Sequence, residues 1–172
     1  MPERAAEDSP FWRYSLRFYA LPDVAPACLV LQDEGGADVN LLLLLLFLAE
    51  ANKQATPDDV RRLDAVIAIW REETVKPLRN LRRRLKAGVA GMPADKGEHL
   101  RNHIKRVELE AERIEQKRLE QEASSMTFVS SRSRAEAAKV NLAAYKAYLG
   151  SLPEDALKII LAAFTKSLPS PP

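Results

Sequence analysis

Two apolar runs dominate the hydrophobic pattern of the chain. Residues 24–31 and 39–49 are almost free of polar side chains, and an acidic turn containing Gly35 and Gly36 separates them. In a soluble protein, a helix that is apolar on every side lies among other helices, so the second run predicts the central helix of a core. It is also too short for a membrane span, which takes roughly 20 apolar residues. A membrane-inserted hairpin of the two runs is the alternative.

The rest of the pattern is helical. Apolar residues recur three or four positions apart, and the alternation of apolar and polar residues that marks strands is almost absent. Helix starts are marked by side chains that can cap a first turn or by proline within it. These starts are Ser9-Pro10, Asp23 or Ala25-Pro26, Asp38, Thr56-Pro57, Asp95 with Glu98, Ser133 with Glu136, and Ser151 with Glu154. The sequence therefore predicts an all-α protein, a single irregular helical bundle of about six to eight helices.

Two long helical segments occupy the middle of the chain. One apolar stripe runs from Val60 to Leu85 and continues past Pro77, which predicts a kinked helix or two nearly collinear helices. A linker at 88–93 follows, and after it comes one long charged helix. Residues 116–122 of that helix are polar on all sides, so we expect this end to project from the bundle or to fray.

Length and composition indicate one domain. The chain has 172 residues, of which 47% are hydrophobic and 29% charged, enough for a single sizeable core. The expected organisation is a disordered N-terminus at 1–8, a helical core domain at 9–123, a Ser-rich connection at 124–133, a C-terminal helical pair at 134–168 packed on the core, and a tail at 169–172. The alternative is that residues 134–172 form a mobile appendage.

The N-terminal residues and the single cysteine indicate a cytoplasmic protein. The first residues mix acids with Arg4 and contain no apolar segment, which argues against a secretory signal. Cys28 is the only cysteine, so an internal disulfide is excluded. Its neighbours Ala27 and Leu29 suit a small buried side chain better than a reactive thiol.

Basic charge is concentrated in one segment. The net charge is only +2, but basic residues recur through 76–86, where no acid occurs. On a helix, the four that lie three or four positions apart share one face. They are Arg79, Arg82, Arg83 and Lys86. Because arginine donates paired hydrogen bonds to phosphates and carboxylates, this face is the candidate contact for an anionic protein or RNA partner, the ribosome included. The alternative is a solvated face paired internally with Glu72, Glu73 or the glutamates at 108–122.

A second set of candidates surrounds the acidic turn. There Asp38 is expected to cap the following helix, and carboxylates and amides gather near helix ends, where a polar ligand can bind. Asn40 stands at the start of an all-apolar helix, and a buried amide needs hydrogen-bond partners. Together with two tryptophans, these polar side chains form the candidate lining of a ligand pocket. The candidates are Trp12, Gln32, Asp38, Asn40 and Trp70.

Metal and cofactor chemistry has little support. His99 and His103 lie four positions apart and share a helix face, with Asp95 one turn earlier as a third conceivable ligand. Surface helices often carry such pairs by chance, and the Glu-x-x-His pairs of a di-iron bundle are absent. The sequence therefore predicts no metal site, no cofactor and no catalytic residue.

Five sequence blocks resemble a known family. They are F-W-R-Y-S-L-x-x-Y at 11–19, A-C-L-x-L-Q-D at 27–33, D-V-N-L-L-L at 38–43, W-R-x-x-x-V-x-P-L-R-x-L-R-R-x-L-K at 70–86 and V-E-L-E-A-E-R at 107–113. In this order they are similar to an uncharacterised proteobacterial family of small helical proteins, a domain of unknown function. The resemblance implies a small bacterial cytoplasmic protein, and no catalytic or cofactor residue can be carried over from it.

Two functional hypotheses follow. The sequence favours a non-enzymatic interaction or adaptor protein, whose basic helix face contacts an anionic protein or RNA partner together with the projection at 115–122. The alternative is a small-ligand-binding protein, or an enzyme, with a pocket near the turn at 32–40. Convergence of the five pocket candidates would favour the second hypothesis, and a continuous cationic face would favour the first.

Overall fold

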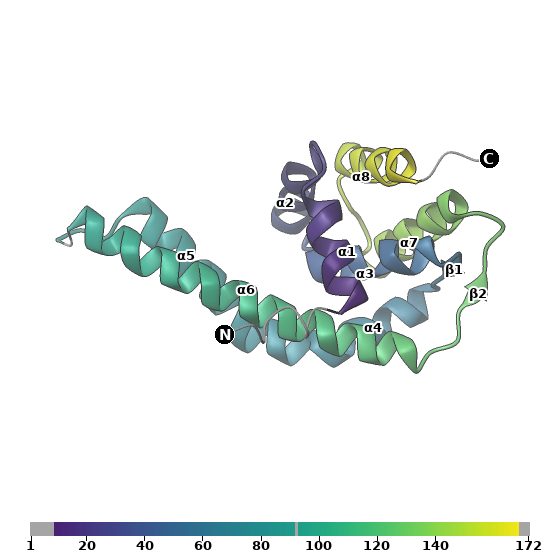
Figure 1. Ribbon diagram of the computed structural model, residues 1–172, viewed down its shortest axis with the longest axis horizontal. Coiled ribbons are helices and arrows are strands. Elements are labelled where there is room, and N and C mark those ends of the chain that lie inside the picture. The colour runs from purple at the N-terminus through teal and green to yellow at the C-terminus, as the bar shows by residue number, and fades with distance from the viewer. Residues whose placement is uncertain (1–8, 92, 169–172) are drawn as a thin grey trace.

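The computed structural model describes residues 9–91 and 93–168, and it confirms the predicted all-α fold (Figure 1). The N-terminus at 1–8 and the tail at 169–172, for which disorder and a non-helical end were predicted, lie outside the described residues. The elements in chain order are α1 (Pro10–Tyr19), α2 (Val24–Gly35), α3 (Val39–Glu50), β1 (Lys53–Gln54), α4 (Pro57–Trp70), the π-helical turn η2 (Arg71–Val75), α5 (Lys76–Ala87), α6 (Ala94–Ser124), β2 (Val129–Ser130), α7 (Arg134–Leu149) and α8 (Glu154–Ser167). The strands β1 and β2, which the sequence pattern does not predict, form a short antiparallel pair.

Side-chain caps explain where several helices begin. In each, a side-chain oxygen accepts a hydrogen bond from a backbone amide of the first turn, which has no partner within the helix. The caps are Ser9 with Trp12 at 3.1 Å, Asp38 with Leu41 at 2.9 Å, Thr56 with Asp59 at 3.2 Å and Ser133 with Glu136 at 3.1 Å. Asp59 also accepts from the Thr56 amide, which completes a capping box. The predictions at these four helix starts are confirmed.

Two other predicted caps are wrong. Helix α6 begins after Pro93 and α8 after Pro153, and neither proline makes a side-chain capping bond. Asp95 instead lies in the first turn of α6, where its negative charge interacts favourably with the helix dipole. Ser151 lies outside α8, because Pro153 occupies the capping position next to the first helical residue.

Helix α3 forms the centre of the core, as its uniform hydrophobicity predicts. All six leucines from Leu41 to Leu46 are buried. Helices α1, α6 and α7 contact α3, and α2 packs against α8. Side chains from α7 and α8, including Tyr145 and Phe164, belong to the same hydrophobic cluster. Within 9–91 and 93–168, no helix is both long enough and apolar enough to span a membrane.

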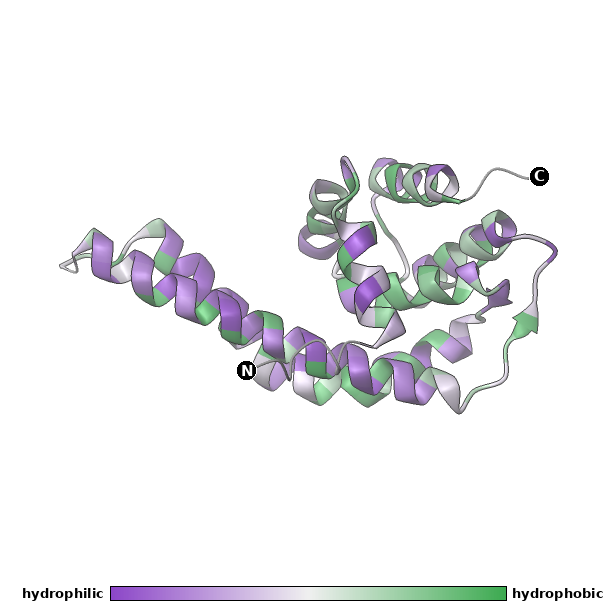
Figure 2. Ribbon diagram, viewed as in Figure 1, coloured by the Kyte–Doolittle hydropathy of each residue, from purple (hydrophilic) through white to green (hydrophobic). Residues whose placement is uncertain are grey.

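Helices α5 and α6 form a hairpin that projects from the rest of the molecule (Figure 1). The chain runs through α4, η2 and α5 with little interruption, which agrees with the prediction of nearly collinear helices around Pro77. The π-helical turn η2 ends just before this proline, which has no amide hydrogen to donate. The projecting part is largely hydrophilic, whereas α3 is strongly hydrophobic (Figure 2).

The prediction that 116–122 projects is wrong, because the opposite end of α6 projects. The C-terminal half of α6 packs against α1, α3 and α4. Leu119 is fully buried, and Gln116 is only 3% exposed. Although these residues are mostly polar, one face of the helix carries Leu119 and Ala123 into the core, and Gln116 hydrogen-bonds within it.

Candidate functional site

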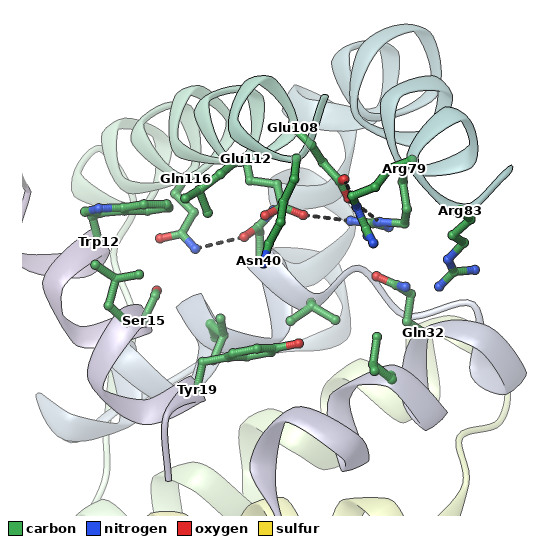
Figure 3. Close-up of a pocket in the computed structure, with 17 residues that line it drawn as sticks. Trp12, Ser15, Tyr19, Gln32, Asn40, Arg79, Arg83, Glu108, Glu112 and Gln116 are labelled. Atoms are coloured by element: carbon green, nitrogen blue, oxygen red, sulfur yellow. Dashed lines mark hydrogen bonds and ion pairs between the residues drawn. The ribbon is translucent and has the colours of Figure 1, made fainter. Parts of the chain in front are cut away.

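A pocket of about 370 Å³ lies where α1, α2 and α3 face the hairpin of α5 and α6 (Figure 3). The first three helices contribute mainly apolar side chains, and α5 and α6 contribute mainly charged ones. The principal lining residues are Trp12, Ser15, Leu16 and Tyr19 from α1, Leu29 and Gln32 from α2, Val39, Asn40 and Leu43 from α3, Arg79, Arg82 and Arg83 from α5, and Lys105, Glu108, Leu109, Glu112 and Gln116 from α6. The volume is typical of small-molecule sites.

The pocket brings together residues from both sets of sequence-derived candidates. Trp12, Gln32 and Asn40 come from the predicted ligand pocket. From the predicted basic face come Arg79, Arg82 and Arg83. Three members of each set, which the sequence analysis assigned to rival hypotheses, therefore line the same cavity.

Asn40 and Gln116, which line the pocket, belong to a chain of buried amide and carboxyl groups. The Asn40 amide nitrogen donates to Glu115 Oε1 at 2.9 Å, and the Gln116 amide nitrogen donates to Asn40 Oδ1 at 2.8 Å. The expectation that a buried Asn40 needs partners is thus met by two adjacent residues of α6. Burial and the nearby charge of Asp38 raise the pKa of Glu115 far above its usual range.

The guanidinium groups of α5 form the other end of the pocket. Arg79 donates to Glu108 Oε1 at 3.3 Å and to Glu112 Oε1 at 2.9 Å. Arg82 also binds Glu108, with its Nη2 at 3.1 Å from Oε1, and this hydrogen bond raises the pKa of Arg82. Burial raises the pKa of Glu112, while the charge of Arg79 acts in the opposite direction. Two of the four predicted contact residues, Arg79 and Arg82, are therefore paired with glutamates of α6, as the alternative interpretation of this face expected.

Two further cations at the pocket are less constrained. Arg83 donates to Asp33 Oδ1 at 2.9 Å, and both side chains are more than 40% exposed. The exposed Lys105 has no carboxylate within 4.0 Å among the residues that the structure describes. Because exposed ion pairs contribute little energy, both cations are available to an anionic ligand.

The remaining sequence-derived candidates lie elsewhere. Trp70 is directed toward α6, where its indole nitrogen donates to the Ala111 carbonyl at 3.0 Å. Lys86 lies beyond this pocket, in a separate cavity near the turn of the α5–α6 hairpin. Asp38 caps α3 and lines a neighbouring cavity of about 400 Å³, to which Gln32 and Arg79 also contribute.

That neighbouring cavity is lined by a paired charge network. Arg71, which begins the π-helical turn, donates to Asp64 at 2.5 Å. Tyr148 donates to the second Asp64 oxygen at 2.8 Å. Tyr145 donates to the Asp38 carbonyl at 3.2 Å and accepts from the Asp38 amide at 2.7 Å. These polar groups satisfy one another, so the network has a structural role in holding α3, α4 and α7 together.

Cys28, His99 and His103 are the other residues considered from the sequence. Burial raises the pKa of the Cys28 thiol to about 12, which makes it a poor nucleophile. His103 Nδ1 lies 3.1 Å from the backbone oxygen of His99. Within the described ranges, no group of three or more histidine, cysteine, aspartate or glutamate side chains is placed to hold a metal ion.

Several polar or charged lining residues were not among the sequence-derived candidates. They are Ser15, Tyr19, Lys105, Glu108, Glu112 and Gln116. Ser15 and Tyr19 share the α1 sequence with Trp12, and their spacing places all three on neighbouring faces of one helix. The α6 residues were not predicted to line a pocket, because their regular charged pattern is typical of a solvent-exposed helix.

Comparison with curated proteins finds no match, and comparison with solved structures finds none either. A family model described as "Protein of unknown function (DUF2390)" matches residues 10–119. Every residue that lines the pocket lies within this span, whereas the neighbouring cavity extends to Tyr145 and Tyr148 outside it. The chain thus belongs to the DUF2390 family, a family of proteins of unknown function.

Proposed function

We propose that this protein binds a small amphipathic acid in the pocket between α1, α2, α3 and the α5–α6 hairpin. The observation that carries the proposal is the gathering of cations at one end of a cavity whose other helices present apolar side chains. The cations are Arg79, Arg82, Arg83 and Lys105, and the acids in the lining are Glu108 and Glu112. The excess of positive charge favours an anionic ligand.

The apolar side of the pocket supports an amphipathic ligand rather than a simple inorganic ion. Leu16, Leu29 and Leu109 are 49%, 45% and 48% exposed, and all three line the cavity. Large apolar side chains grouped at one concave site are typical of binding surfaces, because a ligand there removes them from water. An aliphatic or aromatic part of the ligand would cover them.

The arginines suit a carboxylate or phosphate. A guanidinium group donates two parallel hydrogen bonds to either oxyanion, and it keeps its charge at all physiological pH values. The exposed pair between Arg83 and Asp33 can open at little cost, while Arg79 and Arg82 are held in place by Glu108. The cationic end of the pocket is therefore partly fixed and partly adaptable.

Isothermal titration calorimetry with decanoate, decyl phosphate and uncharged decanol tests this proposal. We expect the two anions to bind and decanol to bind much more weakly, with an affinity for the anions that falls as salt increases. Lys105→Gln and Arg83→Gln should each weaken binding by about threefold to tenfold, because each removes one cation from the pocket. Lys117→Gln, an exposed change of the same charge on α6, is the matched control.

Two results would contradict the proposal. Equal binding of decanol and decanoate would show that the cations take no part. Equal loss of affinity in Lys117→Gln and Lys105→Gln would show that only the overall charge matters.

A second candidate function is contact with an anionic protein or RNA partner through α5. It is favoured by the exposure of Arg84 and Lys86 at the projecting end of this helix. Such contact would be mainly electrostatic, so binding to an RNA oligonucleotide should weaken steeply with salt and be lost in an Arg84→Glu, Lys86→Glu variant. Salt-independent binding would argue against it. Location in the bacterial cytoplasm is part of both proposals and is supported by the sequence blocks that carry the family resemblance.

A further inference from the structure

Two residues that line the pocket, Ser15 and Gln116, carry buried side-chain oxygen atoms. Ser15 is 2% exposed and Gln116 is 3% exposed. Among the described residues, neither Ser15 Oγ nor Gln116 Oε1 has a hydrogen-bond partner, although both residues line the pocket. The two side chains lie at the same end of the cavity, next to Trp12 (Figure 3).

The chemistry of each side chain, and the hydrogen bonds it already makes, determine whether its oxygen can accept or donate a further hydrogen bond. The Gln116 amide nitrogen is already engaged with Asn40 at 2.8 Å, so its Oε1 is the free atom and can only accept. The Ser15 hydroxyl can both donate and accept. A ligand hydroxyl has the chemistry that both atoms need, since it can donate to Gln116 Oε1 and accept from the Ser15 hydroxyl. Buried polar atoms are rarely left unpaired in folded proteins, which makes this end of the pocket a specific polar subsite.

The polar subsite lies far from the cationic end. Arg82 binds Glu108, which is eight positions before Gln116 on the same helix. With a rise of 1.5 Å per residue, the two ends are roughly 12 Å apart along α6. Because three bonds of an extended chain span roughly 3.5 Å, about ten bonds are needed to connect an acid group at one end with a hydroxyl at the other.

We propose that the ligand is an acid that carries a hydroxyl group at its far end, about ten bonds from the carboxylate or phosphate. This inference rests on the proposed function, because it adds a polar group to the amphipathic acid. The acid group contacts the cations, the apolar chain covers Leu16 and Leu29, and the hydroxyl binds Ser15 and Gln116. Short hydroxy acids and α-amino acids cannot reach both ends.

The experiment compares decanoate with 10-hydroxydecanoate, which differ only in the terminal hydroxyl. Calorimetry on the full chain measures both affinities below the concentrations at which these acids aggregate. We expect the hydroxy acid to bind about threefold to tenfold more tightly, the gain of about one good hydrogen bond. In Ser15→Ala the ratio of the two affinities should fall toward one, because the ligand hydroxyl loses this partner.

A second variant and a control complete the test. Gln116→Leu should also abolish the preference. Because this change breaks the hydrogen bond to Asn40, circular dichroism is used to check that the variant keeps its native helix content. Ser15→Ala loses no hydrogen bond with a described residue, so its result decides the test by itself. Ser124→Ala, on the far end of α6, should leave the preference intact.

The outcomes separate this inference from the function on which it rests. Equal affinities for the two acids, or a preference that survives in Ser15→Ala, would overturn the polar subsite and leave acid binding in place. Failure of both acids to bind would overturn the proposed function and the subsite together.

Discussion

Asn40 and Glu115 are joined by a buried hydrogen bond of 2.9 Å, although 75 positions separate them in the chain. The bond connects the first turn of the central helix α3 to the C-terminal half of α6. Glu115 is 1% exposed, and burial together with the charge of Asp38 raises its pKa far above the usual range. Its carboxyl group therefore keeps its proton in the folded protein at neutral pH.

The raised pKa of Glu115 makes stability depend on pH. The folded state holds the proton more strongly than the unfolded chain, whose glutamates have a pKa of about 4.3. As the pH rises above that value, the unfolded chain loses the proton first, so the free energy of unfolding decreases. In Glu115→Gln this loss should be absent. The variant should gain stability over the natural protein between pH 5 and pH 8, by at most about 1.4 kcal/mol per pH unit.

Urea denaturation at pH 5 and at pH 8 measures this difference. Glu110→Gln, an exposed change on the same helix, provides the control and should behave like the natural protein at both values. If the free energies of unfolding of Glu115→Gln and the natural protein differ by the same amount at pH 5 and pH 8, the pKa of Glu115 is not raised in the folded protein.

Local signals in the sequence predicted the helices well, because helix starts depend on neighbouring residues. Ser9, Asp38, Thr56 and Ser133 each cap a helix through a residue three positions away, and such pairs are visible without knowledge of the fold. The central position of α3 was also predictable, since a helix without a polar face must be covered on all sides.

The pocket could be predicted only in parts, because its residues meet through distant contacts. Trp12, Asn40 and Arg79 were each singled out for separate reasons, and nothing local indicates that they share one cavity. The polar segment at 116–122 was misassigned for a related reason. Its burial depends on hydrogen bonds such as the one between Gln116 and Asn40, and the sequence pattern alone indicates only polarity.

Gly35 marks a close approach between α2 and the segment that precedes α8. A Cβ atom there would lie 2.5 Å from Leu152 Cδ2 and 3.0 Å from Pro153 Cδ, and Leu152 is buried. We expect Gly35→Ala to lower the free energy of unfolding by about 1–3 kcal/mol, because the rigid proline and the buried leucine must shift. Thermal denaturation measures the loss.

A helical glycine elsewhere supplies the control for this prediction. Gly97 lies in α6 with no atom within 4 Å of an added Cβ. Gly97→Ala should be neutral or stabilising by about 0.5–1 kcal/mol, since alanine favours the helix. Combining Gly35→Ala with Leu152→Ala should relieve part of this strain, because the change at Leu152 removes the Cδ2 atom that the added Cβ would meet. Equal melting temperatures for the two alanine variants would show that α8 is not packed against α2 in this way.

The projecting hairpin should be the least stable part of the helical structure. None of the α5 residues is buried, whereas most of α3 is. Local opening is easiest where few apolar contacts must be broken, so amides at 78–87 and 94–100 should exchange at least about tenfold faster than those at 42–48. Hydrogen exchange with mass spectrometry measures both segments in one experiment. Uniform protection along the chain would mean that the hairpin opens only with global unfolding.

Glu108 connects the stability of the hairpin to the chemistry of the pocket. Its carboxylate is 5% exposed and accepts hydrogen bonds from both Arg79 and Arg82. In Glu108→Gln the two guanidinium groups lose this neutralising charge, so the free energy of unfolding should fall by about 2–3 kcal/mol. The same change leaves more positive charge for an acid in the pocket, and the affinity for decanoate should rise by about threefold to tenfold. Calorimetry and urea denaturation of one preparation measure both effects. A variant that lost stability and affinity together would show that Glu108 positions the arginines for the ligand rather than competing with it.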